Sequence, residues 1–134
     1  MAWMRYQAGG AALAIALLAG SGSVAAAASA RPGPVGSSCR EAIGAALRIE
    51  SRELDSATLL DAKAVSRLND RVLSHLRDSK AACAGEHMRV TDALHSARLS
   101  FELVPGALAG DWRIVKADVE MGIAYTEIAH RSAF

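Results

Sequence analysis

The chain contains 134 residues, of which 51% are hydrophobic, 22% are charged and 4% are aromatic, and its formal net charge is +1. A nearly neutral chain has no basic excess with which to bind nucleic-acid phosphates, so it is not expected to bind nucleic acid. The apolar content argues against a disordered tail, and the length is too short for a large α/β enzyme domain.

The first 30 residues have the three parts of a secretory signal peptide. Arg5 is their only charged residue, a short apolar run follows it, and small residues then lead to Ala28 and Ala30, which form an A-x-A sequence. Such a sequence is typical of a cleavage site, which makes Arg31 the first mature residue. We therefore expect an exported protein, periplasmic or secreted, with no membrane segment after cleavage. The alternative is an uncleaved N-terminal anchor.

Two cysteines, Cys39 and Cys83, both lie in the mature part of the chain. An even number of cysteines in an exported protein predicts one intramolecular disulfide. The sequence has neither a C-x-x-C redox motif nor a C-x-x-C-H haem-attachment motif. The cysteines are therefore expected to have a structural role.

The mature chain divides into a short lead-in and one domain. Residues 31–37 are rich in proline and glycine, which predicts a flexible lead-in, and residues 38–134 carry helical patterns throughout. Ser38 and Glu41 have the spacing of a capping box, which predicts that the first helix starts there. Its apolar stripe includes Cys39.

A second amphipathic helix, with apolar residues up to Cys83, is expected to start near Thr58, with Asp55 or Ser56 as alternative starts. We expect a long turn near residues 55–61 before it; the alternative is that the residues before Ile43 are extended. The cysteines test this arrangement. In an antiparallel pair of helices, Cys39 and Cys83 lie level only if the turn is centred near Asp61, midway between them.

Two further helices follow. The third has an apolar stripe over residues 90–104 and is expected to stop at Pro105. The fourth begins after the capping residue Asp111 and continues to about His130. It is apolar over a wide arc, so we expect it to need neighbours on both flanks and to lie at the centre of the core.

These elements predict an all-α fold. Four amphipathic helices with short connections form a small antiparallel helical bundle, held by one disulfide and preceded by a signal segment. A domain of about 100 residues buries enough surface to be stable with one covalent cross-link.

Histidines are the residues best suited to bind a metal. Two of them follow an acidic residue at a spacing of three, which places both side chains on one helix face, as in di-iron bundles. These pairs are Asp92 with His95 and Glu127 with His130, and a further carboxylate would have to come from Glu50 or Glu53. Such pairs are common on solvated helix surfaces, so no metal site is predicted.

A haem- or metal-binding bundle is the alternative. A small exported four-helix bundle with a histidine near its C-terminus is similar in outline to the soluble periplasmic b-type cytochromes. The resemblance would make His130 one ligand. In a haem- or metal-binding bundle of this chain, the second ligand would have to be His87, His95 or Met88. The methionine that this family uses near its mature N-terminus has no counterpart in residues 31–48.

No phosphate-binding glycine loop, nucleophile elbow or zinc-protease motif occurs in the sequence, so we expect no enzymatic activity and no cofactor. The remaining interpretation is a binding or accessory module for another protein or for a small apolar ligand held between helices. Phe101, Trp112 and Tyr125 are candidate anchors for which core packing is the simpler role. Phe134, at the C-terminus, is the aromatic residue that can be exposed to solvent.

Overall fold

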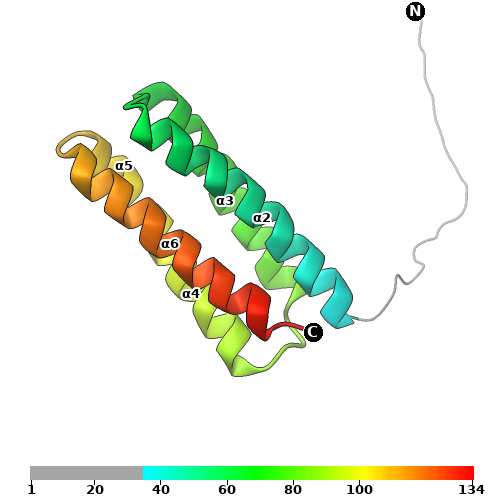
Figure 1. Cartoon of the computed structure of the whole chain (residues 1–134). Coiled ribbons are helices and arrows are strands. Elements are labelled where there is room, and N and C mark those ends of the chain that lie inside the picture. Colours follow the sequence, from blue (N-terminus) through cyan, green and yellow to red (C-terminus); the bar gives the residue numbers. More distant parts are fainter. Residues whose placement is uncertain (1–34) are drawn as a thin grey trace, which may run out of the picture. The chain divides into compact units, whose positions relative to one another are not determined.

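The computed structural model describes residues 35–134, which form a bundle of helices (Figure 1). The long helices are α2 (Val35–Thr58), α3 (Ala62–Ala82), α4 (Met88–Glu102) and α6 (Trp112–Ser132), and the short helix α5 (Val104–Leu108) joins α4 to α6. These residues contain no β-strand. The expected all-α fold of about four helices is confirmed for this part of the chain.

Each long helix packs against two others. Helix α2 lies against α3 and α6, and α4 lies against α6 and α3, so the four form a ring in cross-section. Figure 1 shows the α2–α3 turn and α5 at one end of the bundle, and the α3–α4 connection and the C-terminus at the other. Neighbouring helices are therefore antiparallel, in up-down-up-down order.

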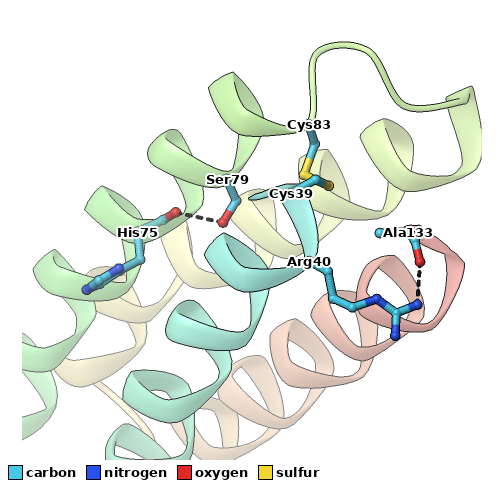
Figure 2. Close-up of a disulfide and its surroundings, with 6 residues drawn as sticks. All are labelled: Cys39, Arg40, His75, Ser79, Cys83 and Ala133. Carbon is cyan, nitrogen blue, oxygen red and sulfur yellow. Dashed lines mark hydrogen bonds between the residues drawn. A yellow bond between two sulfur atoms is a disulfide. The ribbon is translucent and has the colours of Figure 1, made fainter. Parts of the chain in front are cut away.

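The predicted disulfide is present and joins the start of α2 to the end of α3 (Figure 2). The Cα atoms of Cys39 and Cys83 are 4.7 Å apart, so the two residues lie level, as the expected register requires. At the same end of the bundle, the Arg40 guanidinium donates a hydrogen bond to the Ala133 carbonyl, just beyond α6. Three helices are thus held together there.

The buried residues of α2 and α3 mirror each other about the turn. Counting equal numbers of residues inward from the two cysteines gives pairs in which both members are buried: Ile43 and Ser79, Ala46 and Leu76, Glu50 and Val72, Glu53 and Asn69, and Ala57 and Val65. Each pair lies at one level because both helices rise by the same amount per residue. The register predicted from the cysteines therefore extends along the whole pair of helices.

The turn between α2 and α3 is shorter than expected. Helix α2 continues to Thr58 and closes with two backbone hydrogen bonds, from Leu60 N to Ala57 O and from Asp61 N to Ser56 O. This is a Schellman motif, which satisfies the last carbonyls of the helix and removes the need for a long turn. The expected start near Thr58 is wrong, because Asp61 caps α3 by accepting from Ala64 N.

The start of α2 also differs from the sequence-based expectation. The helix begins at Val35, so Ser38 lies within it and the predicted capping box at that residue is wrong. Each added helical residue gains a backbone hydrogen bond, which here outweighs a local side-chain cap. The expected signal peptide, its cleavage residues Ala28, Ala30 and Arg31, and residues 31–34 lie outside the described residues and stay predictions.

In the second half of the bundle, the long helices end close to the predicted residues, but the short helix α5 was not predicted. Helix α4 ends before Pro105, which lies in the first turn of α5, and Asp111 caps α6 by accepting from Arg113 N at 2.8 Å. The Phe101 ring packs directly on Gly122, where an added Cβ would lie 2.3 Å from the ring. Helices α4 and α6 therefore approach closely.

The expectation that the fourth helix is buried on both flanks is only partly correct. One face of α6 is buried along its length, at Val115, Val119, Gly122, Thr126 and Ala129. Ile114 and Met121, which lie seven residues apart on a neighbouring face, are about half exposed. The core therefore lies between all four long helices.

Loss of the disulfide should destabilise the fold. Cys39 and Cys83 are 44 residues apart, and in the chain-entropy model opening such a loop lowers the free energy of unfolding by up to about 4 kcal/mol. We expect Cys39→Ser to lower the melting temperature by several degrees or more. Thermal denaturation with and without reductant checks this, and equal melting of the wild type under both conditions would contradict it.

Leu60 should be replaceable by glycine with a gain in stability. Its φ of 58° is left-handed, which costs a residue with a Cβ about 1 kcal/mol, and its side chain is largely exposed. We expect Leu60→Gly to raise the free energy of unfolding by roughly 0.5 kcal/mol in urea denaturation, after the entropic cost of glycine. Leu59→Gly is the matched control at a residue with ordinary φ, and it should lower stability.

Candidate functional site

The histidines of the predicted metal or haem site have separate local surroundings. His87 caps α4 by accepting from Arg89 N at 3.2 Å, and exposed His95 lies 3.2 Å from Arg98. His130, half-buried on α6, lies near Gly44 of α2, where its Nε2 atom would be 3.9 Å from an added Cβ.

Other residues proposed for that site are exposed, namely Met88, Asp92 and Glu127. In residues 35–134, no group of three or more His, Cys, Asp or Glu side chains is placed to hold a metal ion. The structure therefore does not bring these predicted ligands together as a set.

The aromatic residues lie as expected. Phe101 is fully buried, Trp112 and Tyr125 are half-buried against the core, and Phe134 is exposed. The Phe134 ring meets the His87 ring edge-on, with the ring centroids 6.5 Å apart. The first three therefore serve mainly as core packing.

A groove with a volume of about 590 Å³ lies between α3 and α4. Its apolar residues include Leu76 and Leu94, which belong to the core, and Ala81 and Ala84, whose small side chains leave space near the end of α3. Thr91 faces this region from α4. The size lies in the range of small-molecule sites.

The polar residues of the groove are mostly cationic. Arg77 and Lys80 from α3 and Arg98 from α4 line it, together with His95. The lining described for this groove includes no acidic residue. Arg98 also lies 3.9 Å from Glu102, but such partly exposed pairs contribute little free energy, so its guanidinium stays available.

A second unusual feature lies in the core. Glu50 and Glu53 of α2 are both 0% exposed, and their spacing of three places them on one face of the helix. In the sequence, the two glutamates were candidates only for an additional metal ligand. A signal for their burial was nevertheless present, because the steps of three and four from Cys39 through Ile43 and Ala46 continue through both glutamates to Ala57.

Glu50 has one hydrogen-bond partner among the described residues. Its Oε2 atom lies 2.9 Å from the Thr126 hydroxyl, which also lies 3.0 Å from the Gly122 carbonyl. A hydroxyl has one proton, so Thr126 either donates to ionised Glu50 or donates to Gly122 and accepts from protonated Glu50. The contact therefore suits both protonation states.

Asn69 of α3 is also buried, with 1% of its surface exposed. Its Nδ2 donates to the Phe101 carbonyl at 3.0 Å, which fixes the orientation of the amide. Within the described part of the chain, its Oδ1 atom has no hydrogen-bond partner, and neither does any oxygen of Glu53.

Burial changes the acidity of both glutamates. It raises the pKa of Glu50 from 4.5 to about 8, against the lowering effect of the Thr126 hydrogen bond and with a further increase from the Glu127 charge. Burial likewise raises the pKa of Glu53 to about 8, and the Glu50 and Asp70 charges add to the shift. In the metal-free protein, both carboxyls are therefore mainly protonated at pH 7.

Comparison with known proteins gives no match, since no family model, curated protein or solved structure is significantly similar to the chain. None of the described helices combines the length and the apolar composition needed to cross a membrane.

Stability of the metal-free protein should fall as the pH rises from about 4.5 to about 8. The folded-state pKa values of Glu50 and Glu53 lie above the unfolded value, so the folded state holds more protons in this interval. The stabilising effect is complete below pH 4.5 and is lost through pH 8, with a total on the order of several kcal/mol.

Urea denaturation across this range, with chelator present, measures the effect. The double variant Glu50→Gln/Glu53→Gln should remove most of the decrease, whereas Glu41→Gln, at an exposed residue of α2, should retain it. A decrease that persists unchanged in the double variant would assign it to other groups.

Proposed function

We propose that the protein is an exported binding protein for a small anionic amphiphile, which lies in the α3–α4 groove. The main support for this proposal is that one groove combines an apolar surface with three cationic side chains. This deepens the sequence-based expectation of a binding module for a small apolar ligand. The leader and the disulfide support export to an oxidising compartment.

The apolar residues favour a hydrocarbon chain as one part of the ligand. Leu76 and Leu94 are buried beneath the groove, whereas Ala81 and Ala84 line it as exposed apolar residues. Covering these surfaces removes apolar area from water, which supplies a favourable free energy without rearrangement of the core. A single chain suits a narrow space between two helices better than a bulky ring system does.

The cationic residues favour an anionic head group. Arg77 and Lys80 are one turn apart on α3, and Arg98 faces them from α4. A carboxylate or a phosphate that lies between them accepts charge-assisted hydrogen bonds, which are stronger than neutral ones. The charges are exposed before binding, so the ligand need not displace a buried ion pair.

Titration calorimetry with laurate tests this proposal. We expect saturable binding below the micelle concentration, at least about tenfold tighter than binding of dodecanol, because the alcohol lacks the charge. Dodecyltrimethylammonium, with the same chain and the opposite charge, should not bind. Equal binding of all three compounds, or no binding of laurate, would contradict the proposal.

Amino-acid substitutions test whether laurate binds in the α3–α4 groove. Arg77→Glu/Lys80→Glu should weaken laurate binding at least about tenfold, whereas Lys63→Glu, on α3 but outside the groove, should leave it unchanged. Ala84→Trp should fill the groove from an exposed residue and block binding without disturbing the core. Full affinity in both groove variants would place the ligand elsewhere.

A further inference from the structure

The core layer around Glu50 and Glu53 contains several buried oxygen atoms without a hydrogen-bond partner among the described residues. Five buried side-chain oxygen atoms have no hydrogen-bond partner among the described residues, and four of them belong to this layer: Glu50 Oε1, both carboxylate oxygens of Glu53, and Asn69 Oδ1. Buried acceptors without partners are rare in native proteins and costly. Their concentration in one layer places four unpartnered oxygen acceptors among three helices.

Three helices bring these residues together. Asn69 lies as far before Cys83 as Glu53 lies after Cys39, so the two are level in the antiparallel pair. The Asn69 amide donates through Nδ2 to α4, which turns its Oδ1 away from that helix. Thr126 of α6 approaches Glu50 to 2.9 Å. The Asn69 amide is therefore held at the level of Glu53, and its Oδ1 has no hydrogen-bond partner in the described part of the chain.

The charges around this layer favour a cation. In the described part of the chain, the ion pairs are Arg98–Glu102 and Arg113–Asp111, so neither buried glutamate is paired with a basic side chain. The neighbouring charges that act most strongly on the pair are themselves carboxylates, Asp70 of α3 and Glu127 of α6. When these carboxyls are ionised, their buried charges require a partner, and no basic side chain among the described residues forms an ion pair with them.

We propose that Glu50, Glu53, Asn69 and Thr126 form a buried binding site for Ca²⁺. Two carboxylates, which bind through one or both oxygens, together with one amide oxygen and one hydroxyl oxygen reach the lower end of the six to eight oxygen ligands that Ca²⁺ takes. The two acidic ligands neutralise the ion, and the other two are neutral. Mg²⁺ fits less well because it retains several water molecules, and this layer is closed to solvent.

The binding of Ca²⁺ can be written so that both the charges and the protons of the site are accounted for. The carboxyl groups of Glu50 and Glu53 release any protons they carry when Ca²⁺ enters, so the loaded site is neutral and no oxidation or reduction takes place. Both side chains are fully buried in the folded chain. The ion is therefore expected to enter during folding, and the test uses refolded protein.

The experiment refolds the full protein from guanidinium with its disulfide intact, after metal removal, in Ca²⁺, in Mg²⁺ or in chelator. We expect Ca²⁺ to raise the melting temperature by several degrees and to remain bound, one ion per chain, through gel filtration, whereas Mg²⁺ has a smaller effect. An identical melting temperature in Ca²⁺ and in chelator, with no retained ion, would show that the layer holds only protons or water.

Matched variants separate this site from other calcium effects. Glu50→Gln and Glu53→Gln should lose both the temperature shift and the bound ion, whereas Glu120→Gln, at an exposed residue of α6, should keep both. If the Gln variants do not fold, Thr126→Val removes a ligand at similar volume and should weaken Ca²⁺ binding several-fold. Retention of bound Ca²⁺ in all of these variants would overturn the proposal.

The groove variants keep the two proposals distinguishable. Ala84→Trp alters the α3–α4 groove and leaves the glutamate layer intact, so it should retain the Ca²⁺-dependent shift even if it blocks laurate binding. A loss of the shift in Ala84→Trp would show that calcium acts outside the glutamate layer.

Discussion

The rest of the structure depends on the register between α2 and α3. The Cys39–Cys83 disulfide fixes this register at one end of the helix pair, and the turn at Leu60 fixes it at the other. A shift by one residue would move each side chain of one helix by about 1.5 Å along the axis and rotate it by about 100°. Such a shift would separate Glu53 from Asn69 and turn core residues toward solvent. One covalent bond and one tight turn thus determine which side chains meet in the core.

This register gives the bundle a polar layer that a small core does not need for stability. Elsewhere the stripe of α2 that faces α3 consists of cysteine, isoleucine and alanine, which pack without a hydrogen-bond requirement. Two carboxyl groups in the same stripe are stable only if they are neutral or are compensated by a ligand. Residues that break the local rules of a fold in this way are typical of sites with a function.

The groove and the glutamate layer depend on different parts of the bundle. The groove lies where α3 meets α4, and Ala81 and Ala84, which line it, are close in sequence to the disulfide residue Cys83. The layer lies among α2, α3 and α6, with the Asn69 amide tied to α4. A ligand in the groove therefore needs no change at the glutamates, so both sites can be filled at once.

The sequence by itself determined the helices, their order, the cap at Asp111 and the disulfide, because each depends on local periodicity or on the spacing of two cysteines. It misplaced the start of α2, where backbone hydrogen bonding outweighs the local cap at Ser38, and the start of α3, which Asp61 caps. It also did not predict the short helix α5.

Only the tertiary structure decided which charged residues are buried. Glu50 and Glu53 continue the apolar spacing of α2, but charged residues are usually solvated, so the spacing alone did not establish their burial. The groove could not be predicted from the sequence either. The space between α3 and α4 depends on how four helices fill their common core rather than on any one segment.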